Sequence, residues 1–171
     1  MRVVELLKSA HPKENFSCGV ALLDNYLWHQ AGQDVRRKLT ACFVLTESET
    51  GLIEGYYTLS NSSIPLNMVP DGFRKHLPQS YSSIPVTLIG RLAVDKRFHG
   101  KGTGEYLLID ALKKSFDLSR TIGSFAVAVD PINEQKVGFY LKYGFVSLPD
   151  SHKLFLPMKT IGQIFDSTNK K

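Results

Sequence analysis

A glycine-rich segment in the middle of the chain constrains the fold more than any other feature of the sequence. The segment reads Arg97-Phe98-His99-Gly100-Lys101-Gly102-Thr103-Gly104 and follows an apolar stretch, residues 86–94, that is typical of a strand. An amphipathic helix comes next, marked by Leu107, Leu108, Ala111, Leu112 and Phe116. Glycines let backbone N–H groups converge, and a helix N-terminus adds partial positive charge. Strand, loop and helix in this order therefore predict a phosphate-binding site.

Two common phosphate loops do not fit this segment. A nucleoside-triphosphate loop needs Ser or Thr directly after Gly-Lys, whereas Lys101 is followed by Gly102. A dinucleotide fingerprint needs G-x-G-x-x-G, whereas the spacing here is G-x-G-x-G and a hairpin, not a βαβ repeat, precedes it. A connection in which the glycines serve only a tight turn is the remaining structural alternative.

Apolar periodicity predicts a mixed α/β domain with a sheet at its centre. The expected helices are 17–33, a short piece at 73–77, the helix after the glycine-rich segment, and 133–143, which Gly144 ends. The expected strands are 41–46 and 53–60 around a turn at 47–51, then 86–94, 124–129, and a last hairpin of 146–148 and 154–158. Residues 61–85, which contain four prolines, are expected to be irregular, and 166–171 to be a frayed tail.

Length and composition limit the number of domains, the cellular location and the partners that can be expected. A chain of 171 residues fits one domain over 1–171, with its core at about 16–158. No apolar stretch predicts a membrane span or a secretory signal, and Cys18 and Cys42 are expected to be reduced thiols, so a cytoplasmic protein without a membrane partner is expected. The net charge of +5 favours a polyanionic partner, although a solvated basic surface is equally compatible with it.

The glycine-rich segment resembles the R/Q-x-x-G-x-G/A signature of the Gcn5-related N-acetyltransferase (GNAT) superfamily, through Arg97, Gly100 and Gly102. The resemblance implies a single-domain GNAT fold, with a central mixed, mostly antiparallel sheet flanked by helices. It also implies acetyl-CoA as co-substrate: the loop amides hold the pyrophosphate, and the strand before the loop pairs with the pantetheine arm. The cofactor-binding residues implied in this way, together with one from the next signature, are Leu92, Ala93, Val94, Arg97, His99, Gly100, Lys101, Gly102, Thr103, Gly104 and Asn133.

A second segment resembles another acetyltransferase signature, in which a strand is followed by an asparagine and then by a helix that carries a Phe-Tyr pair. Asn133 and Tyr140 stand at the family spacing, and Lys136 departs from it because a small residue is usual there. The resemblance implies that Tyr140 is the general acid. A phenol, with a pKa of about 10, can protonate a thiolate leaving group whose conjugate acid has a pKa of about 8.5, and still stay protonated at neutral pH. A packed aromatic side chain is the alternative role for Tyr140.

Motifs spread over residues 16–158 resemble one branch of the superfamily, the acetyltransferase toxins of bacterial toxin–antitoxin pairs. They include Leu23-Asp24-Asn25-Tyr26-Leu27, Gly55-Tyr56-Tyr57-Thr58-Leu59-Ser60 and Gly90-Arg91-Leu92-Ala93-Val94-Asp95. The branch implies acetylation of the amino group on aminoacyl-tRNA, which blocks translation, and also a homodimer and a ribbon-helix-helix antitoxin. His99 and Thr103 depart from the branch, where glutamine and an apolar residue are common.

Basic residues fit a tRNA substrate. Arg36, Arg37 and Lys38 follow the first expected helix, and Arg91 precedes the expected cofactor strand, so these four are candidates for phosphate contacts. A solvated surface cluster is the alternative for the first three, and a structural pairing of Arg91 with a core carboxylate is the alternative for the fourth. The histidines have no metal-ligand spacing, so no metal is expected.

Two other functions remain open at this point. One keeps the enzyme but changes the acceptor to a small-molecule amine or a protein N-terminus. No residue stands out as a general base that would deprotonate the attacking amine. An α-amine, with a pKa of about 7.7–8.0, is partly neutral without such a base, whereas a lysine amine, at about 10.4, is not, so an α-amine acceptor is favoured. The other alternative is a non-catalytic module that binds nucleic acid or a partner protein.

Overall fold

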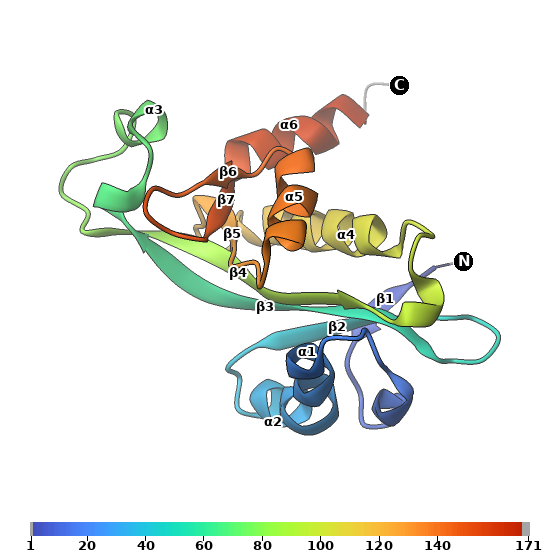
Figure 1. Cartoon of the computed structure of the whole chain (residues 1–171). Helices are drawn as coiled ribbons and strands as arrows, with labels where there is room; N and C mark the ends of the chain where they lie inside the picture. The colour runs from blue at the N-terminus through green and yellow to red at the C-terminus, as the bar shows by residue number, and fades with distance from the viewer. Residues whose placement is uncertain (1, 169–171) are drawn as a thin grey trace. The chain divides into compact units, whose positions relative to one another are not determined.

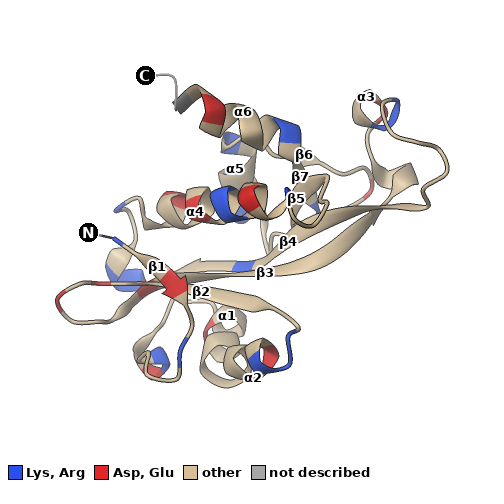
Figure 2. Ribbon diagram, turned by 180° about the vertical axis from the view of Figure 1, so that it is seen from behind, with Lys and Arg blue, Asp and Glu red and all other residues tan. Residues whose placement is uncertain are grey.

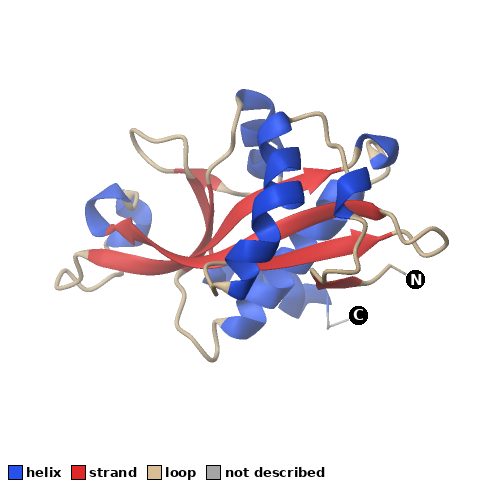
Figure 3. Ribbon diagram, turned by 90° about the horizontal axis from the view of Figure 1, so that it is seen from below, coloured by secondary structure: helices blue, strands red, loops and turns tan. Residues whose placement is uncertain are grey.

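Strands and helices are interspersed along the chain in the computed structural model, which describes residues 2–168 (Figures 1 and 3). In chain order they are β1 (Val4–Leu6), α1 (Ala21–Asn25), α2 (Ala31–Arg36), β2 (Ala41–Thr46), β3 (Ile53–Pro65), α3 (Asp71–Arg74), β4 (Ser83–Val94), α4 (Thr103–Leu118), β5 (Ala126–Val129), α5 (Glu134–Lys142), β6 (Val146–Ser147), β7 (Leu154–Pro157) and α6 (Met158–Thr168). A π-helical turn, η2 (Tyr26–Gln30), joins α1 to α2, and a 3₁₀ turn, η4 (Lys96–Phe98), follows β4.

The strands form a mixed sheet in the order β1-β2-β3-β4-β5-β7-β6. β1 pairs antiparallel with β2, β2 with β3, and β7 with both β5 and β6. β4 and β5 are parallel, with Val86 opposite Ala126, and α4 is the crossover between them. The predicted mixed, mostly antiparallel sheet with helices is thereby confirmed.

Contacts divide the chain into two compact units. The first contains residues up to 60 together with 90–111, and the second contains 61–89 together with 112 onward. The long strands β3 and β4 and the helix α4 each contribute residues to both units. The assignment of one domain to residues 1–171 stays a prediction.

In the first unit, the helical segment from α1 to α2 packs on β2 and β3 (Figure 1). The predicted helical spacing is confirmed at Leu23, Leu27 and Ala31, which are buried against Cys42 and Tyr56. The close packing removes the Cys42 thiol from water, and this burial raises its pKa to about 12. Cys42 is therefore an unreactive core residue, as expected for a reduced thiol.

Gly55 in β3 lies at a close approach within the first unit. A Cβ at this position would lie 2.6 Å from Cδ1 of Leu107 and 2.7 Å from the carbonyl oxygen of Ala93. Only glycine leaves room for α4 and β4 at this point. Two residues further along β3, the buried Tyr57 hydroxyl donates a 2.6 Å hydrogen bond to Asp110 of α4.

In the second unit, β5 and β7 are buried along their whole length. Phe155 of β7 meets Phe73 edge-on at 5.3 Å and stacks on Phe125 at 6.4 Å. The helix α6 begins directly after β7, and Gly162 lets it approach Phe116 so closely that a Cβ would lie 2.8 Å from that ring.

Three sequence-based expectations about secondary structure were wrong, and one strand was not predicted. The first helix begins at Ala21, because Gly19 has a φ of +91° and residues 17–18 instead donate hydrogen bonds to the Asp24 side chain, and it continues to Arg36. Residues 61–85 are not wholly irregular, since β3 continues to Pro65 and β4 begins at Ser83; Pro85 lacks a donor, but its carbonyl accepts from Phe125. The three-residue β1 was missed. Residues 166–168 belong to α6, and 169–171 of the expected frayed tail lie outside the described residues.

Candidate active site

The glycine-rich segment forms an open turn ahead of α4. Gly100 and Gly102 have φ angles of +71° and +76°, a region that side chains disfavour, and a Cβ on either residue would meet nothing within 4 Å. The helix α4 starts at Thr103, so its first N–H groups, which lack partners inside the helix, follow the turn directly. The space and the positive helix end suit an anionic group.

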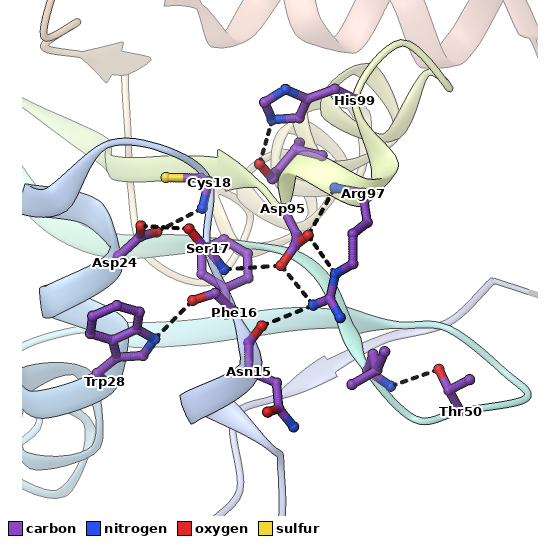
Figure 4. A network of polar contacts seen from close by, with 12 residues as sticks. Asn15, Phe16, Ser17, Cys18, Asp24, Trp28, Thr50, Asp95, Arg97 and His99 are labelled. Carbon is purple, nitrogen blue, oxygen red and sulfur yellow. Dashed lines mark hydrogen bonds and ion pairs between the residues drawn. The ribbon is translucent and has the colours of Figure 1, made fainter.

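A salt-bridged clamp fixes the start of this segment (Figure 4). Asp95, which is 2% exposed, caps η4 and accepts hydrogen bonds from the backbone and guanidinium of Arg97. Ser17 donates its N–H to the same carboxylate, and Arg97 also donates to the carbonyl of Asn15. The Arg97 side chain is thus used to join the loop to residues 15–17.

The clamp keeps the Asp95 carboxylate ionised. Burial alone would raise the pKa of this carboxyl, but hydrogen bonds from the Arg97 guanidinium and from the N–H groups of Ser17 and Arg97 outweigh burial and lower the pKa to about 2. Sequence patterns did not single out Asp95 as a site residue. The signal that was present is an Asp-x-Arg spacing at the end of an apolar strand, which places a carboxylate and a guanidinium in one tight turn.

His99 turns back onto the strand before the loop. Its Nε2 lies 2.7 Å from the Val94 carbonyl, and because a carbonyl only accepts, Nε2 carries the proton (Figure 4). Leu92 and Ala93 are buried in β4, and Val94 is half-buried. The imidazole is therefore hydrogen-bonded to the last carbonyl of the strand that, by the family resemblance, pairs with the pantetheine arm.

Thr103 and Lys101 differ in what their side chains offer a ligand. The Thr103 hydroxyl is buried, donates to Glu54 at 3.4 Å and accepts from Arg2, so its side chain is used inside the protein. Lys101 is exposed, and its Nζ lies 5.4 Å from the centre of the Phe98 ring. The side chain of Lys101 is therefore the one that can reach an anion in solution.

Tyr140 and Asn133 belong to the second unit. Tyr140 is buried in α5 and meets Phe139 and Phe145 edge-on, at 5.2 and 5.3 Å. Burial raises the pKa of its phenol, which keeps the hydroxyl protonated. No hydrogen bond to this hydroxyl occurs within residues 2–168, so the proton is not committed to a neighbouring side chain. Asn133 caps α5 by accepting from the N–H of Lys136 at 2.9 Å.

The predicted basic residues separate into two places. Arg36 is the last residue of α2 and not a residue after it, and Arg37 and Lys38 complete the turn that follows; Figure 2 shows this basic segment in blue. Among the carboxylates of residues 2–168, none pairs with Arg91. Its guanidinium carbon lies 3.4 Å from the centre of the Tyr26 ring, at a cavity of about 380 Å³.

Residues 40–145 match the family model described as Acetyltransferase (GNAT) family. The chain belongs to this family. It is 31% identical over 154 residues to a tRNA-acetylating toxin of Mycobacterium tuberculosis, with 90% of each chain covered. It is also 29% identical over 169 residues to a probable toxin TacT of Sinorhizobium fredii, with 94% of this chain and 93% of the relative covered.

Solved structures of similar chains agree with this assignment. A tyrosine-to-phenylalanine variant of KacT has 30% identity and a TM-score of 0.89, with 96% of this chain and 99% of KacT covered. AtaT complexed with acetyl-methionyl-tRNAfMet has 27% identity, the same TM-score and the same coverage. AtaTR bound with acetyl-CoA has 27% identity and a TM-score of 0.84, with 96% and 98% covered. The GNAT fold and the acetyltransferase class of this chain are therefore established.

Residues 2–168 hold neither a metal cluster nor a membrane-spanning helix. No group of three or more His, Cys, Asp or Glu side chains there is arranged to hold a metal ion. None of the helices in the same range combines the length and apolar character that crossing a bilayer requires.

Proposed function

We propose that this protein transfers the acetyl group of acetyl-CoA to the α-amino group of an aminoacyl-tRNA and thereby blocks translation. The observation that carries the proposal is the match, over nine tenths of both chains, to a relative that acetylates tRNA. The open turn at Gly100 and Gly102 is consistent with it, because it suits a pyrophosphate.

The donor site uses backbone more than side chains. The N–H groups that follow Gly100 and the N-terminus of α4 would hold the pyrophosphate, and Lys101 would add a mobile charge. The end of β4, at Leu92, Ala93 and Val94, would pair with the pantetheine arm, after His99 releases the Val94 carbonyl. In this arrangement Arg97 and Asn133 act by shaping the loop and capping α5, because their side chains already have partners.

Tyr140 would supply the proton that the reaction needs. The acceptor nitrogen forms a bond to the thioester carbonyl carbon, and the carbon–sulfur bond breaks with its electron pair leaving on sulfur. The Tyr140 hydroxyl gives its proton to that sulfur, and the acceptor nitrogen loses one proton to water. Burial keeps the phenol protonated across the physiological pH range, so the proton is present when the thiolate leaves, and water then returns a proton to the Tyr140 phenolate.

An α-amine is the acceptor that this site can use without a strong base. A useful fraction of an α-amino group, with a pKa of about 7.7–8.0, is neutral at physiological pH. The basic segment at Arg36, Arg37 and Lys38, together with Arg91, would contribute affinity for RNA phosphates.

The partners and the location of the protein are proposed by analogy with the same relatives. AtaT has been solved bound to the C-terminus of the antitoxin AtaR, and KacTA has been solved with DNA. By analogy, we expect a ribbon-helix-helix antitoxin, a homodimer and a cytoplasmic location for this protein.

Transfer of labelled acetyl from acetyl-CoA to a pool of charged tRNAs tests the proposal. Wild type should label aminoacyl-tRNA, and Tyr140→Phe should lose about 100-fold in kcat, the scale of general acid catalysis. Tyr81→Phe is the matched control, because Tyr81 is an exposed tyrosine in the loop before β4.

Each other outcome has a definite meaning. Full activity of Tyr140→Phe would remove the general acid and leave the substrate class standing. Absence of label on every charged tRNA, from wild-type protein that binds acetyl-CoA, would overturn the tRNA proposal. Small amines and protein N-termini would then be assayed with the same label.

A further inference from the structure

A cavity of about 380 Å³ opens beside the first helical segment and β4, inside the first unit. Its lining consists of Leu22, Asn25, Tyr26, His29, Gln30 and Arg91. The lining contains no carboxylate, and it combines an aromatic ring, a guanidinium and two side-chain amides. A ligand with a flat π-surface, hydrogen-bonding edges and negative charge nearby would match this lining.

The helix is irregular at the residues that line this cavity. In η2 the N–H of Ala31 bonds to the carbonyl of Tyr26, five residues earlier, so the turn holds one residue more than an α-helical turn. Single π-turns of this kind are uncommon and occur frequently at functional sites. Tyr26, His29 and Gln30 all belong to η2, so the irregular turn and the cavity coincide.

Arg91 is held in place while its hydrogen-bond donors stay available. Its guanidinium stacks on the Tyr26 ring at 3.4 Å, and that ring is fixed in turn by a hydrogen bond from its hydroxyl to Asp34. Within residues 2–168, no carboxylate and no hydrogen-bond acceptor engages the guanidinium. A half-buried arginine in this state presents five N–H donors and a second flat face to a ligand.

A second, smaller cavity shares His29 with the first. It measures about 280 Å³ and is lined by Lys13, Glu14, Trp28 and His29. The half-buried Trp28 indole is fixed by a 2.9 Å hydrogen bond to the Phe16 carbonyl. Two flat side chains, Arg91 and Trp28, thus line two cavities that share His29.

Lys13, which lines the second cavity, lies close to another cation, Arg36. A Cβ on Gly32 would lie 3.4 Å from a guanidinium nitrogen of Arg36 and 3.5 Å from Nζ of Lys13, so these two cations converge over Gly32. Flat side chains with cations beside them are the arrangement that binds single-stranded nucleic acid.

We propose that the two cavities bind the unpaired 3′ end of the RNA acceptor, with the base of the terminal nucleotide stacked on the guanidinium of Arg91. The preceding base would lie against Trp28, and Lys13 and Arg36 would contact phosphates. Unpaired bases of RNA are commonly stacked on aromatic rings or on arginine planes, and their edges are read by groups such as the amides of Asn25 and Gln30. This inference rests on the proposed tRNA substrate, and it assigns the place where the end of that substrate is held.

The amino acid carried by the tRNA is the alternative occupant of the first cavity. A hydrophobic side chain would use Leu22, but not the open face of the Arg91 guanidinium or the amides of Asn25 and Gln30. A base uses all of these, so the stacked base fits the lining better.

The test uses an uncharged tRNA acceptor minihelix with 2-aminopurine as its terminal base, whose fluorescence falls on stacking. Wild type should quench the fluorophore, and Arg91→Lys, which keeps the charge but removes the plane, should lose most of the quenching and about tenfold in affinity. Arg120→Lys is the matched control, since Arg120 lies over the Phe116 ring at 5.0 Å but lines neither cavity.

A second variant tests the same cavity in case Arg91→Lys does not fold. Leu22 is 70% exposed at the cavity mouth, so Leu22→Glu should fold normally and repel the RNA end, weakening minihelix binding at low salt by about tenfold. Quenching that is unchanged in both variants would overturn the inference. The same conclusion would follow if Arg91→Lys altered only the preference among amino acids.

The outcomes separate this inference from the proposed function. Acetylation of charged tRNA by wild type, without quenching, would remove the stacking site and keep the function. Quenching without acetylation of any charged tRNA would remove the function and keep a site for an RNA end.

Discussion

The guanidinium of Arg97 donates one hydrogen bond to each carboxylate oxygen of Asp95, at 2.8 Å in both cases. This two-pronged geometry is among the strongest that an arginine makes. Because Asp95 also accepts from Ser17, the pair joins the glycine-rich loop to the segment that precedes α1. The loop conformation therefore depends on a charge that lies outside the loop itself.

The stability that Asp95 contributes should be lost in acid. Its pKa is lowered in the fold from an ordinary value of 3.8 to about 2, so the contribution is present above pH 4 and disappears as the pH falls from about 4 to about 2. Asp95→Asn should therefore cost about 2 kcal/mol at pH 7 and much less near pH 2.5. Urea unfolding across this pH range measures the difference in free energy of unfolding between wild type and Asp95→Asn.

Asp117→Asn is the control for this measurement, because Asp117 pairs with Lys113 on the exposed face of α4. Its cost should stay below about 0.5 kcal/mol at every pH. A gap between wild type and Asp95→Asn that did not narrow in acid would contradict the assignment of the charge to Asp95.

Gly55→Ala should destabilise the protein by about 1–3 kcal/mol, because the added methyl group would overlap Leu107 and the Ala93 carbonyl. Gly138→Ala is the matched control. Gly138 lies in α5 with open space around its Cα, so alanine there should stabilise the helix by up to about 1 kcal/mol. Opposite shifts of the two thermal midpoints are expected, and shifts of the same sign would refute the close packing at Gly55.

Lys38→Gly should stabilise the protein by about 1 kcal/mol, although it removes a basic residue. Lys38 has a φ of +62° at the end of α2, where its N–H bonds to Val35 and the next N–H bonds to Asp34. Glycine adopts this left-handed conformation without steric cost.

The control for Lys38→Gly is Lys75→Gly, because Lys75 follows α3 with an ordinary helical φ of −59°. Chemical denaturation should show that this second change gives no stabilisation. If Lys38→Gly also weakened RNA binding, the charge of Lys38 would be shown to matter separately from its backbone.

The phenol of Tyr140 should stay protonated well above pH 10. Burial raises its pKa, so kcat should rise as the acceptor amine loses its proton near pH 8 and should then stay level to pH 10. The same shift means that the fold loses stability when the pH exceeds about 10, since only the unfolded phenol ionises readily there.

Ultraviolet absorbance of phenolate, compared between wild type and Tyr140→Phe, follows this titration directly. A fall in kcat between pH 8 and 10 that accompanied Tyr140 ionisation would contradict the burial of the phenol.

Sequence patterns predicted those elements in which apolar residues recur at a regular spacing or in which a distinctive residue marks an end. The spacing of Leu23, Leu27 and Ala31 indicated the first helix, and the expected strand at 41–46 coincides with β2. Gly144 was predicted to end α5 in the left-handed conformation, and its φ is +91°. Each of these signals depends on local chemistry alone.

The parts that sequence patterns missed depend on distant partners. β1 is too short to show the alternation of apolar and polar residues that marks a strand, and it forms because Val4 pairs with Leu45. Most of α6 was not predicted, and its last residues, 166–168, were assigned to the tail, because its packing needs the gap that Gly162 leaves for Phe116. Within the site, the roles of Asp95 and Tyr26 come from contacts with Ser17 and Arg91, which lie far away in the sequence.

The extra residue in η2 determines how α2 is rotated about the helix axis relative to α1. An α-helix advances about 100° per residue, so deletion of one residue between 26 and 30 would turn α2 by that angle relative to α1. Asp34 would then leave the Tyr26 hydroxyl, and Ala31 would leave the core. A natural relative that lacks this residue cannot keep both the core and the Arg91 cavity, so the length of this one turn is a simple marker for chains that share the cavity.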